Sequence, residues 1–184
     1  MEIKGTAVKS IPEYVRQKYP GEYINWVKAL SPKSQEIMDS ASTSAWYSLK
    51  DAAIDPSKKV AEMFFNNDTK KGAWELGRFS AEMALNGVYK IYVKLSSPTH
   101  IVSRGSRVFA AYYTPSKMEV VNLRENMVNV VMTDFNPPSD VIEYRIAGWM
   151  ERALEISGCK AVQIKIEKSL TKGDSSTIFQ CSWN

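Results

Sequence analysis

The sequence predicts an α+β fold in which a helical layer packs on one face of an antiparallel sheet. Apolar residues recur at helical spacing through the first half of the chain, and their period falls to about two beyond residue 117. A further helical pattern then separates two pairs of short strands. Strands joined by tight turns are antiparallel, so the predicted order is helices, hairpin, helix, hairpin. With 184 residues, of which 44% are hydrophobic, the chain (1–184) is expected to form one ligand-binding domain.

The first half of the chain is predicted to be a series of short helices separated by Pro-, Gly- and Ser-rich breaks. They follow a short edge strand at residues 2–8, and their expected ranges are 12–30 with a break at Pro20-Gly21, 32–40, the stretch after Trp46-Tyr47 through Ile54, and 56–65. Ser31 stands at the N-cap of the second of these, with Pro32 at the first helical position.

Residues 73–95 form the strongest predicted helix of the first half. This segment is apolar over most of its circumference, which indicates burial on two sides. Gly77, Ala81 and Ala84 make a strip of small residues along it, and such a strip lets another helix approach closely. Ser97-Pro98 ends the helix, and a further one is expected over 98–113.

The second half alternates strand pairs with one helix. The expected elements are a hairpin of 118–123 and 127–133, a helix over 140–157, and strands over 162–167 and 178–183. Ser139 is the predicted N-cap of this helix, and Gly158 is its predicted left-handed terminator. Its charged residues are expected to face mainly water, and they are Glu143, Arg145, Glu151, Arg152 and Glu155.

Composition argues against several classes of function. The net charge is +4 with no block of Lys or Arg, so no nucleic-acid partner is expected. No apolar run approaches the ~20 residues of a membrane span, and residues 1–17 lack the apolar core of a secretory signal. Cys159 and Cys181 fit a reducing compartment, so we expect a cytoplasmic protein with both thiols free.

The single histidine, His100, limits the available chemistry. Zinc sites built mainly from His and Cys use about four such ligands, and this chain has one His and two Cys. A Ser-His-Asp triad would have to use His100, yet no G-x-S-x-G turn is present to hold the serine. A P-loop and a G-x-G-x-x-G motif are also absent. We therefore expect no cofactor, no metal and no catalytic site.

Several short sequence signatures, in a fixed order along the chain, resemble those of a superfamily of ligand-binding domains. They are Trp74–Glu82, Asn86–Lys90, Ser97-Pro98, Tyr112-Tyr113 and Gly173-Asp174 followed by Phe179 and Ser182-Trp183. The superfamily comprises haem-NO-binding domains, 4-vinyl-reductase domains and the TRAPP transport subunits that hold an acyl chain. The sequence looks most like uncharacterised bacterial members related to the 4-vinyl-reductase group. The resemblance covers roughly residues 10–184 and implies an α+β fold, an internal ligand and a dimer.

This chain also departs from the motifs of those groups. Haem-NO-binding domains follow a proximal histidine with Y-x-S-x-R, whereas Tyr112–Lys117 reads Y-Y-T-P-S-K, and His100 lies too close to it to match the proximal position. The 4-vinyl-reductase group carries C-x3-G-x3-C-x-F in its last hairpin. Here Ser169 and Thr177 stand in place of the cysteines before Phe179. The metal or redox role of that hairpin is therefore not expected here.

Arg78 is the most informative single residue. It lies in the middle of an otherwise apolar helix, where a cation needs either a carboxylate partner or a ligand anion. Both interpretations stay open. Arg104 and Arg107 offer weaker cases of the same kind. Cys181, between Phe179 and Trp183 on an apolar strand face, is expected to be a buried structural residue.

Large aromatic and methionine side chains gather on the predicted helices, where they form either an ordinary core or an irregular apolar cavity. Our first hypothesis is a non-enzymatic sensor domain that binds a hydrophobic small molecule or a lipid acyl chain and acts as a homodimer. The alternatives are a haem-based NO or gas sensor, a ligand-free adaptor, and a vinyl-tetrapyrrole reductase. The candidate ligand-binding residues are Arg78, Phe79, Met83, Tyr89, Tyr92, Phe109, Tyr113 and Trp149.

Overall fold

The computed structural model describes residues 1–85, 109 and 111–184. The elements of the first half are β1 (Glu2–Lys4), α1 (Gly5–Val8), α2 (Ser10–Lys18), η1 (Pro20–Glu22), α3 (Tyr23–Lys28), α4 (Pro32–Ser40), β2 (Trp46–Ser48), η2 (Lys50–Ile54), α5 (Asp55–Phe64) and α6 (Thr69–Leu85). Those of the second half are β3 (Tyr113–Thr114), β4 (Lys117–Arg124), β5 (Met127–Thr133), α9 (Asp140–Ile156), β6 (Gln163–Lys168), η3 (Leu170–Lys172) and β7 (Thr177–Ser182). The parts of the two predicted helices that fall in 86–108 lie outside the described residues.

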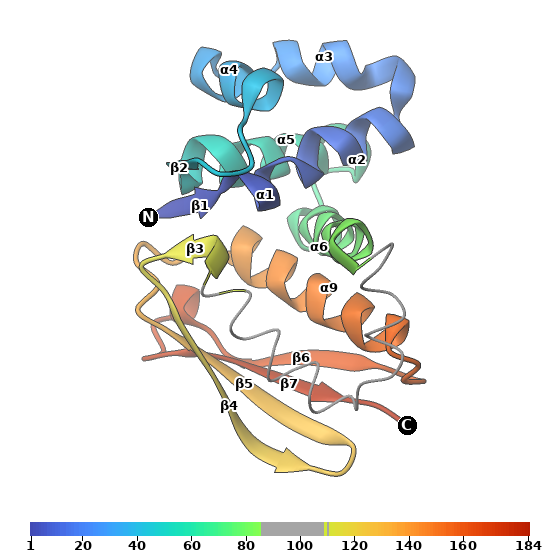
Figure 1. Cartoon of the computed structure of the whole chain (residues 1–184), viewed down its shortest axis with the longest axis vertical. Helices are drawn as coiled ribbons and strands as arrows, with labels where there is room; N and C mark the ends of the chain where they lie inside the picture. Colours follow the sequence, from blue (N-terminus) through green and yellow to red (C-terminus); the bar gives the residue numbers. More distant parts are fainter. Residues whose placement is uncertain (86–108, 110) are drawn as a thin grey trace.

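A four-stranded antiparallel sheet in the order β4-β5-β7-β6 forms the base of the second half. Val130 of β5 pairs with Phe179 of β7, and both side chains are fully buried. Burial alternates along β5 and along β7, so one face of these strands points inward. Helix α9 covers that face (Figure 1). The predicted α+β class, with its second half ordered hairpin, helix, hairpin, is confirmed.

The N-terminal strand differs from the prediction. It is shorter than residues 2–8, and it lies in the centre of a second sheet, β2-β1-β3, rather than at an edge. Ile3 pairs with Tyr47 on one side and with Tyr113 on the other. Residues 46–48 and Tyr113 were expected near or in helices. They form strands because distant segments supply backbone partners that no local pattern reveals.

Helix α6 lies between the N-terminal helices and α9, which confirms burial on two sides (Figure 1). A Cβ added at Gly77 would lie 2.0 Å from the backbone oxygen of Arg145. On α9, a Cβ at Gly148 would lie 2.1 Å from the oxygen of Trp74. The small residue Gly77 therefore serves the contact of α6 with α9 of the same chain.

Local signals explain several helix ends. The Ser31 hydroxyl accepts a hydrogen bond from the Ser34 amide at 3.2 Å, as its N-cap position predicts. Ser139 occupies the N-cap of α9 without using its side chain. The Asp140 carboxylate instead accepts from the Val141 amide at 2.8 Å. Gly158 ends α9 with a left-handed φ of 102°.

Within residues 1–85, 109 and 111–184, no helix combines the length and the apolar composition needed to cross a membrane.

Candidate functional site

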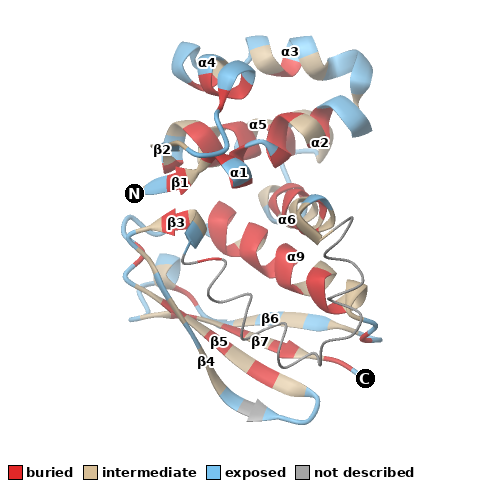
Figure 2. Ribbon diagram, viewed as in Figure 1, coloured by how far each residue is buried: buried red, intermediate tan, exposed pale blue. Residues whose placement is uncertain are grey.

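Two charged residues of α9 that were expected to face water are buried. Glu143 is 2% exposed and Arg145 is 3% exposed. The prediction was wrong for both because α9 contacts α6 on one side and the large sheet on another (Figure 2). Only a narrow part of its circumference is left for solvent, so positions beside the apolar stripe are covered as well.

The carboxylate of Glu143 is surrounded by hydroxyl donors. Ser169 donates to it at 2.7 Å and Thr171 at 3.4 Å, and the hydroxyl of Thr177 also donates to it. Ser169 and Thr177 are the two residues that stand where the 4-vinyl-reductase motif has cysteines. In this chain they bind a buried carboxylate, which gives this end of the hairpin a structural role.

Arg145 has no such partners. Its Nη1 atom is buried and forms no hydrogen bond, and no carboxylate of the described residues pairs with it. Burial lowers the pKa of Arg145, and only the neighbouring Tyr113 opposes this. Burial in turn raises the pKa of Tyr113, so its hydroxyl stays neutral at ordinary pH. An unpaired buried cation of this kind marks a candidate binding site.

Arg145 lines a small hollow of about 10 Å³, which we call the Arg145 hollow. The other described residues that line it are Ala7, Gly77, Ser80, Phe109, Tyr112, Tyr113 and Trp149. The ring of Phe109 packs edge-on against Trp149, with centroids 4.9 Å apart, and its centroid lies 6.5 Å from that of Tyr113. Three of the predicted ligand-binding aromatic residues therefore meet around one arginine.

Two larger spaces lie next to this hollow. The middle cavity, of about 190 Å³, shares Ala7, Ser80 and Tyr112 with the Arg145 hollow. Its other lining residues are Thr6, Lys9, Ser10, Thr43, Met83 and Ala84. The outer groove, of about 530 Å³, shares Lys9 and Met83 with the middle cavity. The three spaces thus form a row from the surface to Arg145.

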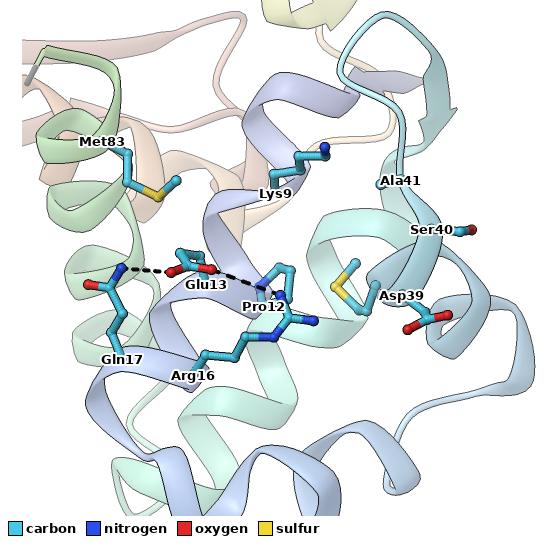
Figure 3. Close-up of a pocket in the computed structure, with 10 residues that line it drawn as sticks. Lys9, Pro12, Glu13, Arg16, Gln17, Asp39, Ser40, Ala41 and Met83 are labelled. Carbon is cyan, nitrogen blue, oxygen red and sulfur yellow. Dashed lines mark hydrogen bonds and ion pairs between the residues drawn. The ribbon is translucent and has the colours of Figure 1, made fainter. Parts of the chain in front are cut away.

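The outer groove has a charged lining (Figure 3). The Glu13 carboxylate accepts a hydrogen bond from the Gln17 amide at 2.7 Å, and its Oε2 atom lies 3.9 Å from Nη1 of Arg16. Lys9 and Asp39 line the same groove. These groups carry both signs of charge, so the groove by itself selects neither anions nor cations.

The remaining predicted site residues are placed differently. Met83 is 43% exposed and lines both the middle cavity and the outer groove. Phe79 is buried and packs edge-on against Tyr14, with centroids 5.3 Å apart, and it lines none of the three spaces. Tyr89 and Tyr92 lie outside the described residues.

Arg78 is used within the fold. It forms ion pairs with Glu151 and with Glu155, the latter at 2.9 Å. Trp74 donates its indole N–H to the same Glu151 at 2.8 Å. Burial alone would lower the pKa of Arg78, but hydrogen bonds to Glu155 and Glu151 raise it above its usual value. Of the two interpretations of Arg78, the internal ion pair is the one observed.

Among the described residues, the usual histidine ligand of a haem iron is missing. These residues include no histidine, and no cluster of His, Cys, Asp and Glu in this part of the chain could hold a metal. Cys159 and Cys181 are free and buried. Burial raises the pKa of Cys181 to about 12, so it stays a thiol. A histidine ligand to the iron could come only from His100, which lies outside the described residues.

Sequence reasoning missed Arg145, although the helical pattern contains a usable signal. Arg145 follows Ile142 by three residues and precedes Trp149 by four. Residues at these spacings share one face of a helix. Arg145 is charged but lies within this apolar stripe, so it is a better site candidate than Arg78, which pairs with Glu151 and Glu155.

Comparison with protein-family models and curated sequences finds no match, whereas comparison with solved structures does. No protein-family model matches the chain, and no curated protein is significantly similar to it. Solved structures of H-NOX proteins, however, are similar in fold. One of them is from S. oneidensis in the Fe(II)NO state, with a TM-score of 0.74, 15% identity and 99% of each chain covered.

A second similar structure is the Fe(II) unliganded H-NOX protein from K. algicida, with a TM-score of 0.72, 12% identity, and 99% of this chain and 97% of that chain covered. A third is the H-NOX domain from Shewanella oneidensis in the Fe(II)CO state, with a TM-score of 0.67, 13% identity and 99% of each chain covered. The haem-NO-binding part of the predicted resemblance is therefore confirmed for the fold, and the chain has the fold of the H-NOX proteins.

Proposed function

We propose that this chain is a sensor domain that binds a small molecule in its interior. The observation that carries the proposal is its likeness to H-NOX structures over 99% of its length. The row of spaces ending at the unpaired Arg145 gives the proposal a location.

The geometry suggests how binding would be transmitted. Residues of α1, α6, β3 and α9 line the Arg145 hollow, so a ligand there would contact the N-terminal helices and α9 together. A ligand that binds only this arrangement stabilises it by RT ln(1 + [L]/Kd), which is about 2.7 kcal/mol at 100 times Kd. Any second arrangement of these elements would lose population accordingly.

The first candidate is a haem-based NO or gas sensor. It is favoured because the similar H-NOX structures are described in Fe(II), Fe(II)NO and Fe(II)CO states. Since the described residues supply no histidine, this candidate depends on His100. The test is the absorption spectrum of the protein purified after expression with added haem precursor. A Soret band that His100→Gly removes supports this candidate, and a spectrum without one contradicts it.

The second candidate is a sensor for an apolar or acyl ligand. The middle cavity favours it, because Ala7, Met83 and Ala84 give it an apolar lining. Burying such a ligand contributes about 0.8 kcal/mol per methylene, so a chain binds without a polar motif. Native mass spectrometry before and after denaturation tests this candidate. A released organic molecule supports it, whereas a ligand-free protein favours the adaptor alternative.

A further inference from the structure

Two residues that line the Arg145 hollow each carry a buried hydrogen-bond donor that lacks an acceptor. The donors are Nη1 of Arg145 and Nε1 of Trp149. Arg145 and Trp149 lie four residues apart on α9, so their side chains project from the same face. Buried polar groups in folded proteins are nearly always hydrogen-bonded. Two residues with unsatisfied donors around one hollow therefore point to a ligand that supplies the acceptor.

This acceptor is better explained by an anion than by a neutral group. Arg145 is a permanent cation, and leaving a buried charge unpaired is costly. The titratable group that acts on it, the hydroxyl of Tyr113, is itself held neutral by burial. The carboxylates of α9 are already engaged elsewhere, since Glu143 binds three hydroxyls and Glu151 binds Arg78. Within the described residues, the chain itself provides no counter-charge.

The sizes of the spaces limit the anion. The Arg145 hollow, at about 10 Å³, has room for one atom of the size of a water oxygen. One carboxylate oxygen fits this space, and the remainder of a ligand must then extend into the adjoining middle cavity. That cavity, at about 190 Å³, is somewhat larger than the ~150 Å³ cavity that accommodates a benzene ring.

We propose that the interior of this chain binds a small amphipathic monocarboxylate. Its carboxylate accepts hydrogen bonds from Arg145 and Trp149, and its apolar tail lies in the middle cavity between Ala7, Met83 and Ala84. This inference rests on the proposed sensor function and names the ligand class for it. Lys9, at the boundary of the middle cavity and the outer groove, adds a second positive charge along the way in.

Octanoate is a suitable probe, with octan-1-ol as the matched ligand that has the same tail and no charge. Titration calorimetry on the purified full chain is expected to show octanoate binding at least tenfold more tightly than octan-1-ol. The variant Arg145→Met keeps the volume of the side chain but loses the cation, so it should bind the two probes equally. Equal binding by the unmodified protein, or an undiminished preference in Arg145→Met, would overturn the proposal.

Two further variants keep the test decisive if Arg145→Met fails to fold. Trp149→Phe removes only the indole donor and should weaken octanoate binding several-fold while leaving octan-1-ol unchanged. Met83→Trp fills the middle cavity and should weaken both probes alike. An unchanged octanoate affinity in both variants contradicts the assigned position of the ligand.

The same measurements test the sensor proposal separately from the monocarboxylate proposal. Extraction of a haem or another molecule from the folded protein, together with no octanoate binding, overturns the monocarboxylate and leaves the sensor proposal standing. Failure of both the extraction and the titration removes the sensor proposal as well.

Discussion

At the scale of single residues, Glu143 and Arg145 form an instructive pair. They lie two positions apart on α9 and are similarly buried, yet Glu143 has three hydroxyl donors and Arg145 has no hydrogen-bond partner for Nη1. A fully satisfied buried charge is part of the fold. An unsatisfied one reduces stability until something binds it. The same helix thus carries one structural and one candidate functional charge.

The first prediction concerns the unpaired charge. Replacing Arg145 by Met should raise the free energy of unfolding of the ligand-free protein by about 1 kcal/mol or more, because an apolar side chain of similar volume avoids the desolvation of an unpaired ion. Urea denaturation measures this difference. Arg152→Met is the control, since Arg152 is paired with Glu82 and Glu155 and its loss should destabilise slightly. A large destabilisation by Arg145→Met would show that Arg145 is satisfied in the fold.

The second prediction concerns the satisfied charge. Thr177→Val should lower the free energy of unfolding by about 1–3 kcal/mol, because it leaves the buried carboxylate of Glu143 with one donor fewer. Thr171→Val is the matched control, since its hydroxyl lies farther away, at 3.4 Å, and should matter less. Equal effects of the two substitutions in thermal denaturation would contradict this account of Glu143.

Individual residues were only partly predictable. The sequence showed that Arg78 needed a partner, and helical spacing alone could not say that Glu151 and Glu155 lie within reach. The structure brings Phe109, Tyr113 and Trp149 together around one internal space. Arg145 was missed because the width of the buried face of α9 depends on how many elements cover it, which is a property of tertiary packing.

At the scale of elements, the contact between α6 and α9 holds the two halves of the chain together. Gly77 and Gly148 let the two backbones approach closely. A chain of charges borders the contact, from Glu82 through Arg152 and Glu155 to Arg78. Close packing and ion pairing therefore act on the same interface.

The third prediction tests the close approach. Gly77→Ala should lower the free energy of unfolding by about 3 kcal/mol, because the new methyl group would lie 2.0 Å from the backbone oxygen of Arg145, so the two helix backbones would have to move apart. Gly21→Ala is the control, since nothing lies within 4 Å of its added carbon, and it should be close to neutral. Denaturant titration of both variants makes the comparison. A small effect at Gly77 would mean that α6 and α9 can move apart at little cost.

The fourth prediction concerns pH. Burial alone would raise the pKa of Glu155, but Arg78 and Arg152 hold it below its ordinary value of 4.5. The folded protein therefore holds the Glu155 carboxylate ionised at a lower pH than the unfolded chain does. This adds stability that is fully present above the unfolded pKa of about 4.5. The added stability is lost as the pH falls through the lower pKa of the folded protein. Urea denaturation between about pH 6 and pH 3 should show this loss, and Glu155→Gln should reduce it by about 1 kcal/mol. An identical pH profile in Glu155→Gln would exclude Glu155 as its source.

Elements with local signals were predicted well. The hairpin β4-β5, the helix α9 and the strands β6 and β7 follow from alternation, spacing and the turn residues between them. The sheet β2-β1-β3 did not follow, because its three short strands come from residues 2–4, 46–48 and 113–114. Pairing over such separations depends on the assembled chain rather than on the propensity of any segment.

At the scale of the whole molecule, the proposed ligand site lies where both halves of the chain meet. Ala7 comes from α1, Ser80 from α6, Tyr113 from β3 and Trp149 from α9. The α+β class was predictable from the order of elements, and the likeness to H-NOX structures adds which α+β fold it is. The position of the site was not predictable, because it depends on how four separate elements converge.

The fifth prediction follows from this position. Saturating octanoate should slow amide hydrogen exchange in α1 and α6 and in α9 together, because one ligand contacts all three elements. Hydrogen exchange read by mass spectrometry resolves these segments. Protection confined to the residues of the outer groove would place the ligand at the surface instead.

The central position of β1 has a consequence for the order in which the chain is made. Ile3 can meet Tyr47 early in synthesis, but Tyr113 emerges from the ribosome much later. Until then one side of the first strand has unpaired backbone groups. A truncated chain that stops before residue 113 would leave this edge of β1 without a partner strand permanently. It should therefore aggregate more readily than the full-length chain.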